Sequence, residues 1–180
     1  MVYSHFRRKG GYDVIKCRNF MPEKIILRAV TDDDEAFLAE VYYSSRRDEV
    51  SAFGWDEAQQ DSFLAMQFSI RQLSYAMQYP DGEDSVILYE NEPAGRIIIG
   101  RSGAEISLID IAVLPQFQGN GIGSEIISRL KQEAANAAIP VVLTVDLANP
   151  KAFALYQKLG FAVSGETQLN YSMQWTPEPK

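Results

Sequence analysis

Three glycines spaced two residues apart form the segment of this sequence with the clearest chemical potential. Gly119, Gly121 and Gly123 follow a run of β-branched residues, and a helical pattern begins directly after them. Glycine lets the backbone approach an anion without interference from a Cβ atom, and the N–H groups at a helix start point outward with partial positive charge. The order of strand, glycine loop and helix therefore predicts a phosphate-binding cradle, with an ordinary tight turn as the alternative.

Two other phosphate-binding loops fit these residues less well. The nucleotide P-loop requires Gly-Lys followed by Ser or Thr, and no lysine occurs in this loop. The dinucleotide fingerprint requires its third glycine or alanine at the position of Ser124. Asp146 ends the next expected strand, roughly where a ribose-binding acid would lie. A nucleotide-dependent oxidoreductase therefore remains the less favoured alternative.

The small number of cysteine and histidine residues limits the kinds of catalytic site and metal site that this chain can form. Cys17 is the only cysteine, which excludes an internal disulfide and a cysteine-rich metal site. His5 is the only histidine and lies near the start of the chain, so we expect neither a histidine-based triad nor a zinc site. Any catalysis has to depend on carboxylates, hydroxyls and backbone groups, and we expect no metal.

The charge balance also bears on partners. The chain carries 17 Lys and Arg against 24 Asp and Glu, a formal net charge of −7. Nucleic-acid binders usually carry a basic patch, so we expect no nucleic-acid partner, whereas an acidic surface attracts amines. No apolar run approaches the ~20 residues that span a bilayer, and no secretory signal is evident. The expected location is the cytoplasm, without a membrane partner.

The start of the chain differs in composition from the rest. Residues 1–20 hold five Lys or Arg and one acid, a local charge of +4. We interpret them as an N-terminal basic extension, or alternatively as a basic arm that docks on the acidic body or a partner. Residues 21–180 are then expected to form a single domain, since roughly 100 to 200 residues is the usual size.

The elements that position the glycine loop follow from hydrophobic periodicity and turn residues. We expect a first helix from an N-cap at Thr31 to about Arg46, and a turn at 91–95 inside a hairpin. The other expected elements are strands at 25–30, 85–90, 96–100, 105–114, 141–147, 161–163 and 169–175, and helices at 56–78, directly after 119–123, and at 150–159. This order indicates an α/β (α+β) fold.

The glycine loop also resembles that of the GNAT acetyltransferase family, whose pattern is Gln/Arg-x-x-Gly-x-Gly/Ala. Gln116, Gly119 and Gly121 match it in one register. Gln118, Gly121 and Gly123 match it in a second, overlapping register. Downstream, ANPKAFALYQKLGF at 148–161 resembles a second family signature, an Asn after a strand followed by a helix that ends in Leu-Tyr-x-x-Leu-Gly-Phe. The resemblance is firm over about 84–175.

The resemblance implies the GNAT acyl-CoA N-acyltransferase fold, a mixed central sheet splayed between strands 4 and 5 and flanked by helices. It implies an enzyme that transfers acetyl from acetyl-CoA to a primary amine of a small molecule or protein, by direct attack in a ternary complex. The alternative is a catalytically inactive acyl-CoA-binding sensor or scaffold. In this family, sheet edges and the late hairpin often mediate dimers, so a homodimer is also to be considered.

The resemblance assigns the acetyl-CoA contacts by position. Backbone groups on the splayed strand would pair with the pantetheine arm, amides of the glycine loop would hold the pyrophosphate, and an Asn would hydrogen-bond near the pantetheine. These residues, together with the tyrosine at the thioester, are Ile111, Ala112, Val113, Gln118, Gly119, Asn120, Gly121, Ile122, Gly123, Ser124, Asn149 and Tyr156.

For the catalytic groups, the resemblance implies that Tyr156 is the general acid that protonates the departing thiolate. Two positions where relatives carry a catalytic Glu hold Ser107 and Thr144 here. The candidates for the general base are therefore Glu105, Asp110 and Asp146.

The expected substrate wall is aromatic, and packing in the core is the favoured interpretation of its side chains. These residues are Tyr42, Tyr43, Phe53, Trp55, Phe68, Tyr75 and Tyr171. The stretch around Trp55 is the predicted substrate loop.

Overall fold

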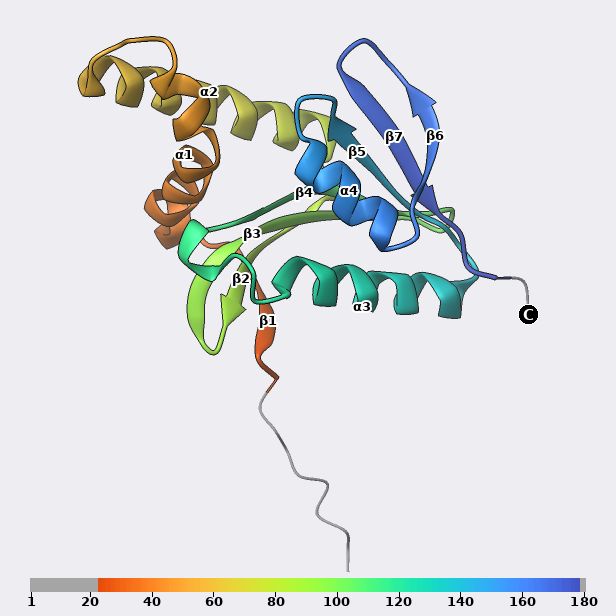
Figure 1. Cartoon of the computed structure of the whole chain (residues 1–180). Helices are drawn as coiled ribbons and strands as arrows, with labels where there is room; N and C mark the ends of the chain where they lie inside the picture. Colours follow the sequence, from red (N-terminus) through yellow and green to blue (C-terminus); the bar gives the residue numbers. More distant parts are fainter. Residues whose placement is uncertain (1–22, 179–180) are drawn as a thin grey trace, which may run out of the picture.

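A seven-stranded mixed sheet in the order β1-β2-β3-β4-β5-β7-β6 organises the computed structural model, which describes residues 23–178 (Figure 1). The strands are β1 (Ile25–Ala29), β2 (Glu83–Tyr89), β3 (Glu92–Arg101), β4 (Ile106–Val113), β5 (Val141–Asp146), β6 (Ala162–Glu166) and β7 (Asn170–Trp175). The expected basic extension at 1–20 lies outside the described residues.

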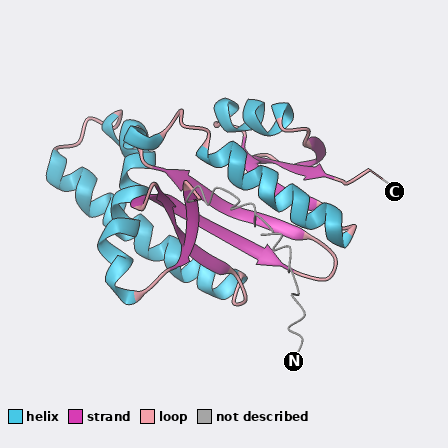
Figure 2. Ribbon diagram, turned by 90° about the horizontal axis from the view of Figure 1, so that it is seen from below, coloured by secondary structure: helices cyan, strands magenta, loops and turns pink. Residues whose placement is uncertain are grey.

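The helices cover both faces of this sheet (Figure 2). They are α1 (Glu35–Ser51), α2 (Glu57–Gln78), α3 (Ile122–Ala137) and α4 (Pro150–Lys158), with short 3-10 helices η1 (Asp32–Asp34) and η2 (Pro115–Phe117). One core joins α3 and α4 to the sheet, for example through Ile126 and Tyr156. A second, smaller core joins α1 and α2 to β2 through Leu38, Phe68 and Val86. None of the described helices has the length and apolarity to cross a membrane.

The sheet splits between β4 and β5, as the sequence analysis predicted. The two strands are parallel and pair only at Ile106 with Val141, Ser107 with Val142, and Leu108 with Leu143. Beyond these pairs β4 continues along β3 and β5 continues along β7. Among residues 23–178, the resulting gap leaves one backbone edge of β4 without a strand partner. The mixed α/β fold with this split is confirmed.

A β-bulge at Ile109 lies at the point where the split begins. Ile99 pairs with Leu108 and Ile98 pairs with Asp110, so Ile109 is the additional residue on β4. Side chains alternate between the faces of a sheet, and one extra residue reverses that alternation. Leu108 and Ile111 consequently both face the core under α3 and α4, and Asp110 faces α1 and α2.

The hairpin between β2 and β3 is tighter than expected. Its turn consists of Glu90 and Asn91, whose φ angles of 52° and 72° are those that a two-residue type I′ turn requires. The expected turn at 91–95 is therefore wrong, and β3 begins at Glu92. Gly95 lies inside this strand, where a Cβ atom would come 2.2 Å from the carbonyl oxygen of Ala112. Helix α1 also runs to Ser51, past the expected end near Arg46.

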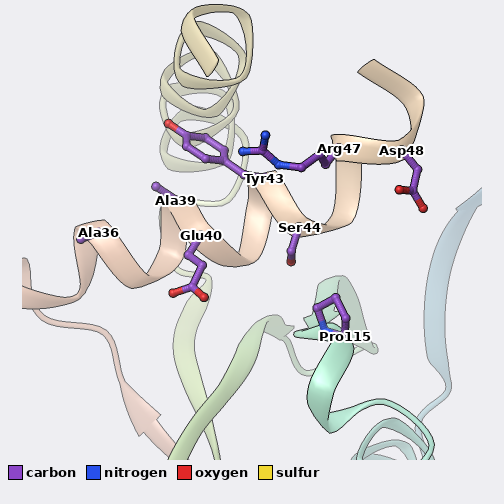
Figure 3. Close-up of a pocket in the computed structure, with 8 residues that line it drawn as sticks. All are labelled: Ala36, Ala39, Glu40, Tyr43, Ser44, Arg47, Asp48 and Pro115. Atoms are coloured by element: carbon purple, nitrogen blue, oxygen red, sulfur yellow. The ribbon is translucent and has the colours of Figure 1, made fainter. Parts of the chain in front are cut away.

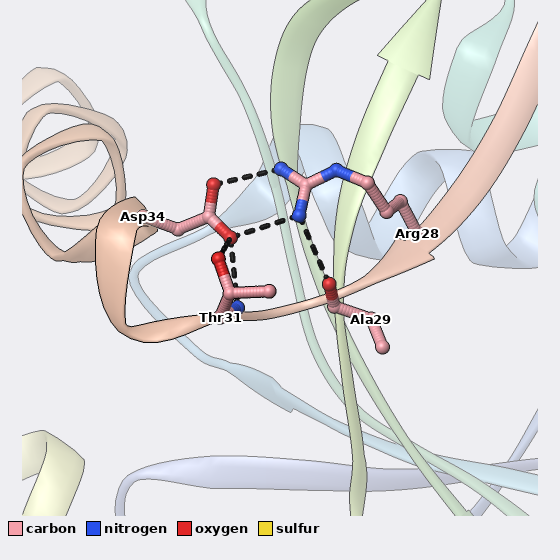
Figure 4. A network of polar contacts seen from close by, with 4 residues as sticks. All are labelled: Arg28, Ala29, Thr31 and Asp34. Atoms are coloured by element: carbon pink, nitrogen blue, oxygen red, sulfur yellow. Dashed lines mark hydrogen bonds and ion pairs between the residues drawn. The ribbon is translucent and has the colours of Figure 1, made fainter.

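A polar network fixes the entry into α1 (Figure 4). Arg28 donates to both carboxylate oxygens of Asp34, at 2.9 and 2.7 Å, and this contact lowers the pKa of Asp34 far below its ordinary value. The backbone N–H and hydroxyl of Thr31 donate to the same carboxylate, at 2.8 and 2.9 Å. The expected helix start at Thr31 holds, because this capping box turns the chain from β1 into η1 and α1.

Candidate active site

The glycine loop presents a row of free backbone donors at the start of α3. Gly119 and Gly121 have φ angles of 81° and 77°, and Gly121 is the N-cap of α3. Among the described residues, no acceptor receives the N–H groups of 119–124, and the first helical hydrogen bond runs from Glu125 to Gly121. Consecutive free N–H groups at a helix N-terminus form an anion-binding site.

Side chains of the loop turn back onto the chain. The Nε2 atom of Gln118 donates to the carbonyl of Val113 at 2.9 Å, and the Nδ2 atom of Asn120 donates to the carbonyl of Phe117 at 3.0 Å. These side chains bond to the segment before the loop and leave the N–H groups of 119–124 without an acceptor among the described residues. The backbone N–H of Gln118 donates to the carbonyl of Pro115 at 3.2 Å, so the expected row of phosphate-binding amides begins at Gly119 and not at Gln118.

A hollow of about 640 Å³ lies beside the loop. Its walls include Asn120 and Ser124 of the loop, together with Lys24 and Arg129. Lys24 pairs with Glu90 at 2.7 Å, and Arg129 donates to the carbonyl of Ile25 at 2.9 Å. Arg129 also pairs with Glu23 at 2.8 Å and with Glu125 at 3.0 Å, so carboxylates offset both cations beside the free amides. Sequence analysis missed both, because Lys24 is far from the loop in the chain and Arg129, a single arginine on α3, forms no pattern typical of an anion site.

The three residues expected to pair with pantetheine lie on β4 beyond the bulge. Ile111 and Val113 are half-buried and pack against the core under α3, and Ala112 faces the other side. Gly123 lies close to this strand, since a Cβ atom there would be 3.9 Å from the Cδ1 atom of Ile111. The glycine loop and the free edge of β4 are therefore adjacent.

Helix α4 brings two more of the predicted residues to the split. Asn149 is its N-cap, and its Oδ1 atom accepts the N–H of Ala152 at 3.0 Å, which directs the Nδ2 group to other acceptors. Tyr156 is 8% exposed and packs against Phe161, with ring centroids 5.9 Å apart. Burial and the negative charge of Asp110 raise the pKa of Tyr156 to about 12. Tyr156 therefore holds its proton at neutral pH, within electrostatic reach of Asp110.

The three candidate bases occupy different places. Asp110 lies at the split and pairs with Arg71 of α2, with 3.2 Å between Nη2 and Oδ1. Glu105 lies before β4, five residues or about 16 Å from Asp110 along the strand, and accepts the hydroxyl of Ser107 at 3.0 Å. Asp146 is exposed and accepts the N–H of Ala148 at 2.8 Å, a bond that shapes the loop before α4. Of the three candidates, only Asp110 contributes to the raised pKa of Tyr156.

Arg71 lies at the centre of an aromatic and charged cluster above Asp110. Its guanidinium carbon is 5.0 Å from the ring centroid of Tyr75 and 5.8 Å from that of Tyr42. Burial raises the pKa of Tyr75, and Asp110 raises it further. The Nε atom of Arg71 is buried and has no hydrogen-bond partner among residues 23–178. The sequence analysis missed Arg71, which is 39 positions from Asp110 in the chain.

A second hollow, of about 480 Å³, lies between α1 and Pro115 after β4 (Figure 3). Glu40 and Ser44 point toward Pro115 in this view. Glu40 and Asp48 contribute carboxylates to the lining, and the cation of Arg47 pairs with Asp61 at 3.0 Å. Such an acidic hollow attracts a cationic amine. Sequence analysis did not single out these residues, because charges on an exposed helix are usually only solvated.

The aromatic residues divide into two groups. Phe68 is buried and contacts Tyr42 and Tyr43, as the favoured core interpretation expects. Phe53 and Trp55 are 55% and 39% exposed, so that interpretation is wrong for them. The loop that holds them joins α1 to α2 at the end of α2 far from Asp110 (Figure 1), about 20 Å along the helix from Arg71. The structure does not bring the predicted substrate loop to Asp110.

The remaining predicted positions lie on the strands that flank the split. Thr144 is exposed on β5 and pairs with Ser172 of β7, and Ser107 lies within the paired part of β4. Tyr171 packs on Phe153 of α4, with ring centroids 4.8 Å apart. The split is thus bordered by α4 on one side and by α2 on the other.

Comparisons with known proteins agree with this geometry. The model of the acetyltransferase (GNAT) family matches residues 34–161, more than half of the chain. A comparison with curated proteins finds no match. The crystal structure of PaiA N-acetyltransferase from Thermoplasma acidophilum in complex with coenzyme A aligns with a TM-score of 0.63 at 19% identity, over 86% of this chain and 99% of that one.

Two further solved structures show the same fold. An acetyltransferase from Thermus thermophilus aligns with a TM-score of 0.63 at 18% identity, over 86% of this chain and 97% of that one. Naa50 from Arabidopsis thaliana, in complex with the bisubstrate analogue CoA-Ac-MVNAL, aligns with a TM-score of 0.55 at 17% identity, over 86% and 99%. At these identities the likeness concerns the fold.

Proposed function

Because the chain belongs to the GNAT family of acetyltransferases, we propose that it transfers the acetyl group of acetyl-CoA to a primary amine by direct attack in a ternary complex. The observation that carries the proposal is the split between β4 and β5 next to the free amides at the start of α3, with Tyr156 and Asp110 on either side of the sheet. One group is a proton donor at neutral pH and the other a carboxylate, and they come from opposite faces of the sheet.

The residues at the split and the glycine loop fit acetyl-CoA. The free amides of 119–124 at the start of α3 suit its phosphates. The unpaired edge of β4 offers backbone groups to the amides of the pantetheine arm, as a neighbouring strand would. The Nδ2 group of Asn149 can donate to the same arm.

Acetyl-CoA supplies a thioester whose carbon–sulfur bond breaks as the carbon–nitrogen bond to the amine forms. Asp110 takes the proton that the attacking nitrogen loses, directly or through water. The hydroxyl of Tyr156 donates to the departing sulfur. Holding both reactants at the split supplies much of the rate, because it turns an encounter of two molecules into a reaction within one complex.

The two proton-handling groups act in concert in this scheme. The negative charge of Asp110 contributes to the raised pKa of Tyr156. When Asp110 accepts a proton its charge disappears, and the pKa of Tyr156 falls. Tyr156 therefore becomes a stronger acid as the thiolate leaves.

We place the amine on the side of α1 and α2, because Asp110 faces that side. The hollow lined by Glu40 and Asp48 lies on the same side and favours a cation before it loses its proton. Small-molecule amines and protein amines both satisfy this chemistry.

The test is release of free CoA from acetyl-CoA, followed with a thiol reagent across polyamines, amino acids, aminoglycosides and peptides. The expected result is turnover on at least one amine, accompanied by a rise in melting temperature with acetyl-CoA. A thermal shift without turnover on any amine would instead support an acyl-CoA-binding sensor or scaffold. The absence of any thermal shift would contradict the assignment of the glycine loop.

A further inference from the structure

Helix α2 carries two apolar faces, and the described residues cover only one of them. The inner face holds Leu64 and Phe68, which are buried against the sheet and α1. The opposite face holds a stripe formed by Met66, Ile70, Leu73 and Met77, which are 50%, 54%, 66% and 82% exposed. Helix α2 lies along the outside of the molecule (Figure 1). Four large apolar side chains in one exposed row are unusual on a surface with no partner.

The spacing of this outer stripe is that of a helix–helix seam. Its residues follow one another at intervals of four, three and four, the alternation that places side chains at the a and d positions of a coiled coil. Phe63 continues the row toward the start of α2, with the rings of Phe53 and Trp55 centred 6.3 and 5.2 Å from its own. The apolar surface thus runs along most of α2, a helix about 33 Å long.

The stripe is also symmetric about its own centre. A two-fold axis through the point midway between Ile70 and Leu73 makes two copies of α2 antiparallel. Ile70 of one copy then faces Leu73 of the other, and Met66 faces Met77. A surface that matches itself in this way is what an isologous two-fold dimer requires.

The charges on α2 agree with self-association. From Ser62 to Gln78 the only charged residue is Arg71, and it turns inward to Asp110. The chain as a whole carries −7, so two copies repel one another over most of their surfaces. The outer stripe is therefore a place where two identical acidic chains can meet without like charges.

The same observation disfavours a membrane surface as the occupant. Interfacial helices carry Lys and Arg on the polar flank beside the apolar face. The exposed flanks of this stripe contain uncharged residues, among them Ala65, Ser69 and Ala76, and the single cation between Ser62 and Gln78, Arg71, pairs with Asp110 on another face of the helix. Small flanking side chains also allow the axes of two helices to approach closely.

We propose that the outer stripe of α2 is the interface of a two-fold homodimer, in which Ile70 and Leu73 of the two copies pack against each other across the axis. The dimer leaves the split sheet open, because the stripe faces away from Arg71 and Asp110. It holds α2 in place from its outer side, opposite the face that carries Arg71. This proposal does not depend on the reaction that the protein catalyses.

The first test is the mass of the full chain in solution, measured by analytical ultracentrifugation over a range of concentrations. The wild type should be a dimer, and Ile70→Glu combined with Leu73→Glu should weaken association by roughly a hundredfold or more. Both positions are more than half exposed, so the variant should fold, and circular dichroism checks this.

The matched control is Val163→Glu combined with Leu169→Glu, two exposed apolar residues on β6 and the β6–β7 turn. It should remain a dimer. A wild type that is monomeric throughout, or a dimer that dissociates in this control and persists in the α2 variant, would overturn the proposal. So would a monomeric wild type that binds vesicles of anionic lipid through the stripe.

A second test probes the antiparallel register of the two α2 helices and does not require a variant that weakens the dimer. On a Cys17→Ser background, chains with Met66→Cys and chains with Met77→Cys are mixed and oxidised. The mixture should form a disulfide-linked dimer. The Met66→Cys chain alone should not, since its two copies lie about 17 Å apart and a disulfide needs Cα atoms within roughly 7 Å. Equal cross-linking of the single variant would exclude the antiparallel register.

Discussion

Asp110 on β4 and Arg71 on α2 form an ion pair across the open part of the sheet, with 3.2 Å between Nη2 and Oδ1. The pair joins the element that splits from β5 to the helix that covers the opposite face. Asp110 also adds to the effect of burial in raising the pKa of Tyr156. Several outcomes of mutation can be derived from this relationship and from the geometry around it.

The first concerns the pair itself. In a double-mutant cycle with Arg71→Leu and Asp110→Asn, urea unfolding should give a coupling energy of about 1 kcal/mol, because 39% of the Arg71 side chain is exposed and solvent weakens the attraction. Asp110→Asn should also cause a large loss of kcat and only a small loss in the free energy of unfolding. Equal kcat in Asp110→Asn and wild type would remove Asp110 from the role of base.

The second prediction concerns the hydroxyl of Tyr156. Tyr156→Phe should lower kcat at least tenfold and up to roughly a hundredfold, with little change in the KM for acetyl-CoA, since only the proton donor is lost. CoA release measures this. Tyr79→Phe, at the exposed end of α2, serves as the control and should behave as wild type. A Tyr156→Phe enzyme of full activity would show that this phenol only packs.

The raised pKa of Tyr156 has a consequence for stability in alkali. Unfolded tyrosine loses its proton near pH 10, whereas folded Tyr156 keeps its proton up to about pH 12. The contribution of Tyr156 to the free energy of unfolding is therefore fully present below pH 10. The free energy of unfolding falls by up to about 3 kcal/mol as the pH rises from about 10 to about 12. Urea melts at both ends of this range should show a smaller loss for Tyr156→Phe than for wild type.

The glycine loop allows a test with matched backbone strain. Gly121 and Gly54 have φ angles of 77° and 72°, and a Cβ atom at either would meet no atom within 4 Å. Alanine should therefore cost both sites a similar stability, about 1 kcal/mol. Only Gly121→Ala should raise the KM for acetyl-CoA, roughly tenfold, because it tilts the free amides. A similar KM in both variants would argue against a phosphate cradle.

The acidic hollow on α1 predicts an effect on the acceptor alone. Glu40→Gln should raise the KM for a cationic amine several-fold and leave the KM for acetyl-CoA unchanged, because the lost charge lies on the amine side. Glu49→Gln is the control on the same helix, outside the hollow, where the carboxylate pairs with Arg46 at 3.1 Å. If both variants behave alike, the hollow does not receive the amine.

Much of the local structure was readable from the sequence. The strand, glycine loop and helix around Gly121 follow from residue types in direct succession, and the same holds for the helix that carries Tyr156. Local rules failed at Glu90 and Asn91, where positive φ angles fall on residues other than glycine and shorten the expected turn. Local rules also failed for Trp55, because the position of an aromatic residue in a loop does not reveal whether its side chain is buried.

By itself the sequence determined the strand, glycine loop and helix, the resemblance to acetyltransferases and the fold class, because each depends on residues close together in the chain or on periodicity within one element. Only the tertiary structure decided which carboxylate reaches the split. The bulge at Ile109 turns Asp110 toward α2, where it meets Arg71, 39 positions away. It also decided which face of α2 is left exposed. Both depend on contacts between distant elements, and the spacing of residues along one element does not contain them.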